Sequence, residues 1–365
     1  CVANAEDPNT DTLQRVYVMP TGEVDGHRNL GDWGPNQVDC YGVKPSPSPG
    51  PSPSPTPSPG PSPVPTPTPQ PGPVPTPTPV PGPGPVSGGF PDGSNTGVPV
   101  GTVLSAYSGP SDINVPGTVI DGKNVNSCLR INVPRVIIKN SKVHARGCAP
   151  SVVNNIAATK YHSGYVIGPI TDRLTIQDSE ITCDDVNVNG NGGGTAIGDN
   201  NVLVLRNNIY NCENGFDIDL SAEIRDNYIH DLYQSRLAHT DGLQSADGSD
   251  MIISHNTFYG DTPGCHNDGS GCGGTSAINI NNCDPARRTG CPTTTNTVVS
   301  NNLLAGGAYT LYCPWLDKNL QVIGNHFSTI FSPKVGAYGY SSDCTNGETQ
   351  SGNVIHETGQ AITLQ

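Results

Sequence analysis

Two aspartates separated by one residue are the clearest candidates for chemistry in this sequence. Asp217 and Asp219 flank Ile218 in the stretch NGFDID. If Ile218 points into a core, both carboxylates point outward, because side chains alternate along a strand, and their Cα atoms lie about 6–7 Å apart. Such a pair could share acid and base work on a glycosidic bond, or could hold a Ca²⁺ ion. The alternative is that both belong to a solvated polar face.

A second candidate is the tetrapeptide HTDG, residues 239–242, within LAHTDGLQ. His239 could carry a proton near neutral pH, or could be an ordinary turn residue. If Leu243 points into the core of a straight strand, Asp241 also points inward, where an unpaired carboxylate is costly. Asp241 therefore either caps backbone amides at a corner, or lies where the strand bends.

A repeated motif predicts the elements that position these residues. Short alternating strands end in Asn or Ser and are followed by another apolar residue, as in LTIQDSEI at 174–181 and AEIRDNYI at 222–229. A repeat near twenty residues with Asn at a turn predicts an all-β parallel β-helix, in which each inward Asn bonds to the next coil. A β-sandwich would instead need hairpin turns. The aligned sixth residues of the motif are Ser141, Ser179, Asn208, Asn227, Asn256, Asn302 and Asn325.

Between these motifs lies a second series of short strands whose central aliphatic residues align. We expect those residues in the core and a polar stripe on the outer side of the same strands, where a sugar chain could lie across the coils. The aligned core residues are Ile197, Ile218, Leu243, Ile278 and Leu311. The outward residues after them are Gly198, Asp219, Gln244, Asn279 and Tyr312, and the residues before them include Asp217. Gln244, Asn279 and Tyr312 are the predicted substrate-binding residues.

Basic side chains form a third expected column. Lys139, Arg206 and Arg225 each come two residues before the aligned Ser or Asn. They could bind an acidic polysaccharide. They could equally be paired with nearby acidic residues, for which Glu180, Glu213 and Glu223 are the candidates.

Twelve cysteines without a Cys-x-x-Cys pair indicate an oxidised, extracellular protein. Cys183 and Cys212 each lie four residues after their aligned motif residue, and strands of neighbouring coils lie about 4.8 Å apart, so we predict a disulfide between them. The close spacings of Cys265 with Cys272 and of Cys283 with Cys291 would each close a small loop. Cys1 could be lipidated, but a disulfide to Cys40 accounts for both cysteines of the N-terminal segment. Elimination leaves Cys128–Cys148 and Cys313–Cys344.

Every second residue from Pro45 to Pro85 is proline, which excludes helix and central strand. We expect a polyproline II linker at 45–87 whose Ser and Thr residues could be O-glycosylated, a short N-terminal segment at 1–44 and the β-helix at 88–365. The net charge of −14, without a basic run anywhere, makes nucleic acid and anionic membrane poor candidate partners. No apolar stretch approaches the roughly 20 residues that span a bilayer.

With its strand repeats and asparagine ladder, the chain resembles the right-handed parallel β-helix proteins of the pectate-lyase-like superfamily over residues 116–356. That resemblance implies extracellular carbohydrate as the usual substrate. HTDG is similar to the Asn-Thr-Asp-Gly motif of polygalacturonases, in which the aspartate belongs to the catalytic set. The sequence lacks the rest of that pattern: no Asp-Asp pair follows shortly after, and there is neither Gly-His-Gly nor Arg-x-Lys.

Two classes of function therefore compete. The first is a secreted enzyme that cleaves an extracellular, uronate-containing or neutral polysaccharide by lyase or hydrolase chemistry, for which the linker resembles those of secreted bacterial polysaccharide-degrading enzymes. The second is a non-catalytic structural, adhesive or glycan-binding protein displayed on a rigid stalk, with self-assembly or surface attachment through residues 1–87.

Overall fold

A computed structural model describes residues 17–18, 24–25, 89–148, 150–157, 170–184, 194–234, 239–264, 273–280, 283–286, 289–345 and 347–365. The chain divides into two units, residues 1–82 and 83–365. In the first unit, β1 (Tyr17–Val18) and β2 (Val24–Asp25) form an antiparallel pair. The linker prediction and the Cys1–Cys40 and Cys265–Cys272 pairings fall outside the described residues.

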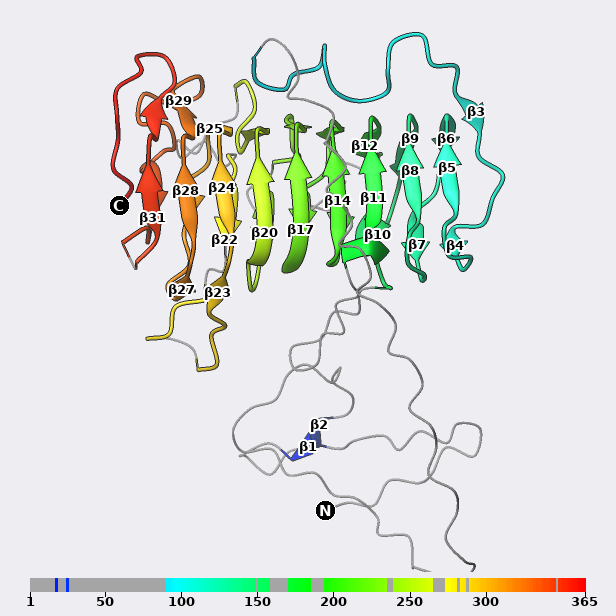
Figure 1. The fold of residues 1–365 in the computed structure, drawn as a ribbon, viewed down its shortest axis with the longest axis horizontal. Helices are drawn as coiled ribbons and strands as arrows, with labels where there is room; N and C mark the ends of the chain where they lie inside the picture. Colours follow the sequence, from blue (N-terminus) through cyan, green and yellow to red (C-terminus); the bar gives the residue numbers. More distant parts are fainter. Residues whose placement is uncertain are drawn as a thin grey trace, which may run out of the picture. The chain divides into compact units, whose positions relative to one another are not determined.

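The second unit is built from three sheets of parallel strands, which we number 1 to 3 (Figure 1). Sheet 1 consists of β4 (Asp112–Ile113), β7 (Leu129–Ile131), β10 (Ser151–Asn154), β13 (Thr195–Gly198), β16 (Asn214–Asp217), β19 (Asp241–Ser245), β22 (Ser276–Ile280), β26 (Tyr309–Tyr312) and β30 (Gly339–Ser342). Sheet 2 consists of β5 (Val119–Asp121), β8 (Ile137–Lys139), β11 (Leu174–Gln177), β14 (Val202–Leu205), β17 (Leu220–Arg225), β20 (Ser249–Ser254), β24 (Val298–Ser300), β28 (Gln321–Ile323) and β31 (Thr349–Ser351).

Sheet 3 consists of β3 (Ser105–Ala106), β6 (Lys123–Val125), β9 (Lys142–Ala145), β12 (Glu180–Cys183), β15 (Asn208–Tyr210), β18 (Tyr228–Ile229), β21 (Thr257–Tyr259), β25 (Leu303–Ala305), β29 (His326–Ser328) and β32 (Val354–Ile355). The described chain adds a short parallel pair, β23 (Thr294–Thr295) with β27 (Asp317–Lys318), and one 3-10 turn, η1 (Ile170–Asp172). No helix among the described residues is long and apolar enough to cross a membrane.

The chain visits sheets 1, 2 and 3 in turn, and each new strand pairs in parallel with the strand one coil earlier. This winding is a parallel β-helix, and the prediction of a right-handed one is confirmed. Apolar side chains from all three sheets fill its interior. On sheet 1 they stack as Leu129, Val153, Ile197, Phe216, Leu243, Ile278 and Leu311, all fully buried.

A ladder of buried polar side chains runs along the corner between sheets 2 and 3, as predicted. The backbone N–H of Asn227 donates to Asn256 Oδ1 (3.0 Å), and the Nδ2 of Asn227 donates to the carbonyl of Val204 on the preceding coil (2.9 Å). The same pattern recurs at Asn256, Asn302 and Asn325. Backbone groups that point into the interior at each corner are thereby hydrogen-bonded.

The residue before each ladder position adopts a positive φ, which turns the backbone through the corner. Asp226 has a φ of 59° and His255 a φ of 52°. Asn and Asp tolerate this conformation better than most residues, which explains their frequency at the corners. Arg206, with a φ of 54°, occupies the same turn position.

One rung of the predicted ladder is wrong by a residue. Leu174 pairs with Val202, so Asn207, which is fully buried, continues the ladder, and the predicted Asn208 lies on the outer side of β15. The disulfide Cys183–Cys212 is nevertheless present, with Cα atoms 4.9 Å apart. The turn at Asn211, with a φ of 62°, accounts for the extra residue. Three further predicted pairings are confirmed: Cys128–Cys148, Cys283–Cys291 and Cys313–Cys344.

Residues 89–104 form an arm that runs along the outside of sheet 3, from the last coils back to the first (Figure 1). At its start, the Phe90 ring lies 5.0 Å from the ring of His326 and 5.7 Å from that of His356. Midway, the Gly97 N–H donates to the carbonyl of Arg206 (2.9 Å). The arm then enters β3, which pairs with β6 at the first coils.

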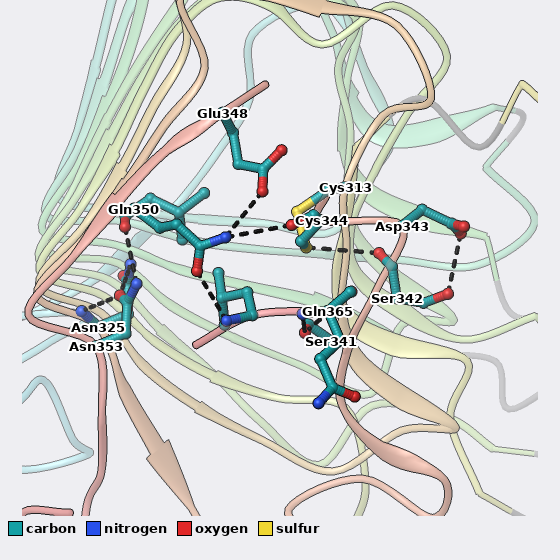
Figure 2. The surroundings of a disulfide bond; sticks show 12 residues. Cys313, Asn325, Ser341, Ser342, Asp343, Cys344, Glu348, Gln350, Asn353 and Gln365 are labelled. Atoms are coloured by element: carbon teal, nitrogen blue, oxygen red, sulfur yellow. Dashed lines mark hydrogen bonds between the residues drawn. A yellow bond between two sulfur atoms is a disulfide. The ribbon is translucent and has the colours of Figure 1, made fainter. Parts of the chain in front are cut away.

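The C-terminal residues close the other end of the solenoid around the Cys313–Cys344 bond (Figure 2). Gln350 Nε2 donates to the carbonyl of Cys344 (3.2 Å), and Gln350 Oε1 accepts from the Leu364 N–H (2.8 Å). Leu364 is buried, and the N–H of Cys344 donates to the carbonyl of Gln365 (3.0 Å). The tail therefore covers apolar residues that a further coil would otherwise bury.

The ladder makes a testable prediction at Asn256. In Asn256→Ala, the buried Asn227 N–H and the Ile224 carbonyl lose their partners, and each such loss costs about 1–3 kcal/mol. We expect the free energy of unfolding, measured by urea denaturation, to fall by about 2 kcal/mol or more. The matched control Asn124→Ala removes an exposed strand asparagine and should change it by less than about 0.5 kcal/mol. Equal effects would contradict a stabilising ladder.

Candidate functional site

The outer side of sheet 1 carries a row of polar side chains on successive coils. The strand register aligns Asn154, Gly198, Asp217, Gln244, Asn279, Tyr312 and Ser342. Asp217, Gln244 and Tyr312 are half-buried, and Asn279 is only 7% exposed. The Oδ1 of Asn279 is buried without a hydrogen-bond partner in the described structure. The predicted stripe of Gln244, Asn279 and Tyr312 is therefore present.

The predicted alignment of the two aspartates is wrong by two residues. Phe216, rather than Ile218, pairs with Leu243 in the core column, so Asp217 takes the outward place assigned to Asp219. The strand β16 ends at Asp217, and Ile218 is buried beyond it, in the turn toward sheet 2. Phe216 and Ile218 are both apolar and are separated by one residue. Alternation along the strand therefore allowed either of them to be aligned with Leu243 in the core column.

Asp219 occupies a buried corner position with a structural contact. Its side chain is 1% exposed, and its Oδ1 accepts from the Ala246 N–H of the next coil (2.6 Å). Its own N–H donates to Asn200 Oδ1 (2.9 Å), and Asn155 Nδ2 donates to the carbonyl of Asn200 (2.7 Å). Asp219 thus belongs to a second, shorter ladder between sheets 1 and 2. It does not share an outer face with Asp217.

Asp241 begins β19 and is 1% exposed. The hydroxyl of Ser276, on the neighbouring strand, donates to its Oδ1 (2.5 Å), and its backbone N–H donates to Asn214 Oδ1 (2.9 Å). Burial, with a contribution from the charge of Glu213, raises the pKa of Asp241 to about 8. Its carboxyl is therefore mostly protonated at neutral pH.

The bend considered for this strand is present one residue after Asp241. A Cβ at Gly242 would lie 2.8 Å from the core ring of Phe258, and the next residue, Leu243, is also in the core. Because two consecutive residues face the core, the alternation breaks between them. Asp241 directly precedes this break, and only glycine fits at 242, where a Cβ would also collide with the backbone carbonyl of Ala277.

Glu213 and His239 lie beside Asp241. Glu213 Oε1 accepts from the backbone N–H of His239 (3.0 Å), and the His239 side chain is exposed. Glu213 was considered in the sequence only as a partner for basic residues. The sequence did not indicate Glu213 as a site residue, because Glu213 and Asp241 lie on successive coils. The loop between those coils has no fixed length, so sequence spacing does not predict which residues become neighbours.

Tyrosines gather at the C-terminal end of the same row. Burial raises the pKa of Tyr312 to about 12, and the nearby Asp241 contributes. The ring of Tyr309 lies 5.6 Å from that of Tyr312 and 5.9 Å from that of Tyr338, which is well exposed. Aromatic rings beside carboxyl and amide groups are the side chains that bind sugar rings and hydroxyls.

The two arginines predicted to bind substrate are engaged in ion pairs elsewhere. Arg206 contacts Asp178 through two hydrogen bonds (2.7 and 2.8 Å), and Arg225 pairs with Glu223. Leu205, rather than Arg206, lies in the column with Lys139 and Arg225, because Arg206 is the turn residue of its corner. The single predicted pair that occurs is Arg225 with Glu223.

Among the described residues, no three His, Cys, Asp or Glu side chains gather in a way that could hold a metal ion. Binding of Ca²⁺ by Asp217 and Asp219 therefore stays a hypothesis, and the described residues do not provide a ligand set for it. What the arrangement offers is a buried carboxyl that is protonated at neutral pH, next to the second carboxyl of Glu213. A carboxyl group that holds a proton at neutral pH, close to another carboxyl group, is an arrangement that general acid–base catalysis can use.

No protein-family model matches the chain, and no curated protein matches its sequence. Among solved structures, the chain is matched to the crystal structure of the Dettilon tailspike protein. It shares 17% sequence identity with this chain at a TM-score of 0.33, over 67% of this chain and 53% of the tailspike chain. The chain therefore spans about half the length of that protein.

The raised pKa of Asp241 predicts a pH dependence of stability. Between about pH 4 and pH 8 the folded chain keeps a proton that the unfolded chain has released, so stability falls as the pH rises, by up to about 1.4 kcal/mol per pH unit from this group. In Asp241→Asn this contribution is absent. We expect the free energy of unfolding, measured between pH 5 and pH 7, to fall less steeply in the variant. Parallel curves would contradict the protonated state.

Proposed function

We propose that residues 88–365 form an extracellular glycoside hydrolase that binds a polysaccharide along the outer side of sheet 1. The observation that carries the proposal is the protonated carboxyl of Asp241, close enough to Glu213 for the charge of Glu213 to raise its pKa, at the edge of a row of half-buried polar and aromatic side chains. Four described disulfides support an oxidising, extracellular environment. In this proposal the proline-rich segment serves as a spacer.

Hydrolysis would use the two carboxyl groups in different roles. Asp241 would donate its proton to the glycosidic oxygen of the leaving sugar, and Glu213 would remove a proton from the attacking water. Asp217, Gln244 and Asn279 would bind hydroxyl groups, and the unpartnered Asn279 Oδ1 supports this role because it lacks a donor. His239, exposed beside Glu213, would line the site. Asp241 must become accessible when the glycan binds, since it is almost fully buried.

The charges on this face favour a neutral glycan over a uronate-containing one. Glu213 and Asp217 lie on it, Asp343 is close enough to affect Tyr312, and the whole chain carries a net charge of −14. Arg206 and Arg225, which could have neutralised uronates, are paired with carboxylates at another corner. An acidic polymer would meet repulsion without a compensating cation.

A second candidate, a glycan-binding protein without catalysis, is favoured by one observation. Asp241 is hydrogen-bonded to Ser276 and buried, as expected of a structural carboxyl. In that case the polar row would bind sugar and Asp241 would only stabilise the coil. The two candidates differ in whether product forms, and in the effect of conservative changes at Asp241.

The catalytic assignment is tested by incubating the protein with neutral glycans, pectins and alginates while following reducing ends and unsaturated products. We expect reducing ends from a neutral glycan, and a fall in rate of roughly 100-fold or more in Glu213→Gln and Asp241→Asn. Asp112→Asn, on the first strand of sheet 1, should keep full activity. Glycan binding without product would leave only the binding function, and unsaturated products would replace the hydrolase with a lyase.

The binding face is tested at Tyr312. We expect Tyr312→Ala to weaken glycan binding by about 1–2 kcal/mol, roughly 5- to 30-fold in Kd, through loss of the ring. Tyr312→Phe keeps the ring and should bind nearly as well as the unmodified protein. Isothermal titration calorimetry with the best-bound glycan measures both. Unchanged affinity in Tyr312→Ala would place the glycan elsewhere.

A further inference from the structure

Two histidines on neighbouring coils face one another on sheet 3, away from the row on sheet 1. His326 begins β29, and His356 directly follows β32, the strand that pairs with β29. Their Nδ1 atoms are 3.1 Å apart, and their ring centroids are 5.3 Å apart. His326 is half-buried and His356 is exposed, so the pair is accessible from solvent.

This pair differs from the other described histidines that make ring hydrogen bonds. His144, His230 and His255 each direct Nδ1 to a carboxylate, at 2.6–2.7 Å. His326 and His356 instead direct Nδ1 atoms toward each other. The nearby carboxylate of Glu357 is occupied by the hydroxyl of Ser328 and the N–H of Thr329.

We propose that His326 and His356 together bind one divalent late transition-metal ion, of the class of Ni²⁺, Cu²⁺ and Zn²⁺. Imidazole nitrogens suit these ions and bind them at about 2.0–2.1 Å. Two bonds of that length spanning 3.1 Å enclose an angle of about 95–100°, close to that of adjacent ligands in square-planar or octahedral coordination. No third His, Cys, Asp or Glu joins them among the described residues, so water completes the coordination and the ion exchanges readily.

The surroundings hold the two rings ready for an ion. Phe90 contacts both rings edge-on, at 5.0 and 5.7 Å between centroids, which restricts their rotation. The ion would join the last two strands of sheet 3, beside the start of the arm.

The test uses the full chain without an added histidine tag and the metals alone as probes. Isothermal titration with Ni²⁺ and Zn²⁺ measures affinity, and electron paramagnetic resonance of added Cu²⁺ counts the bound imidazole nitrogens. The variants are His326→Gln and His356→Gln, with His144→Gln as the matched control, because His144 is a half-buried histidine of the same sheet. Thermal unfolding without metal checks that all three variants fold.

We expect one site with a two-nitrogen copper signal in the unmodified chain and in His144→Gln. Each of the other variants should lose that signal and bind Ni²⁺ at least roughly 10- to 100-fold more weakly. Ni²⁺ should raise the Tm only where both histidines are present. Identical metal binding in all variants, or a single-nitrogen signal, would overturn the proposal. The short distance between the two Nδ1 atoms would then be explained by a hydrogen bond between the rings. The outcome is independent of glycan cleavage, which does not use this sheet.

Discussion

The fold depends on hydrogen bonds from buried amide side chains of one coil to the backbone of the coils on either side. Where the chain turns between sheets 2 and 3, backbone groups face the interior, away from water and out of reach of the sheet ladders. A buried Asn supplies both a donor and an acceptor at that point. Each coil therefore fixes the register of its neighbour, and the register decides which side chains of sheet 1 share the outer face.

Much of this architecture could be predicted from sequence, because the ladder needs one residue type at one place in every coil. The predicted alignment was wrong where two nearby residues fitted the same position of the repeat equally well. The consecutive Asn207 and Asn208 both fit the motif, and only the pairing of Leu174 with Val202 separates them. Phe216 and Ile218 are both apolar and both buried, so alternation alone could not place Asp217 and Asp219.

The candidate site was harder to predict because its chemistry arises between coils of unequal length. Three aspartates on two neighbouring coils have different environments: Asp217 is half-buried on the polar row, Asp219 accepts a backbone N–H at a corner, and Asp241 is buried beside a serine. Glu213 gains its importance from its neighbour one coil away. No spacing rule within a single coil could indicate which carboxyl keeps its proton.

The arm also changes how the coils depend on one another. In a solenoid each coil contacts only its neighbours, so segments can in principle form and open one after another. Phe90, however, packs against His326 and His356, near the opposite end of the chain's path through the domain. The first residues of the domain to be synthesised must therefore wait for the last before they can dock. The arm links distant coils. If it were released, each coil would again contact only the coils next to it.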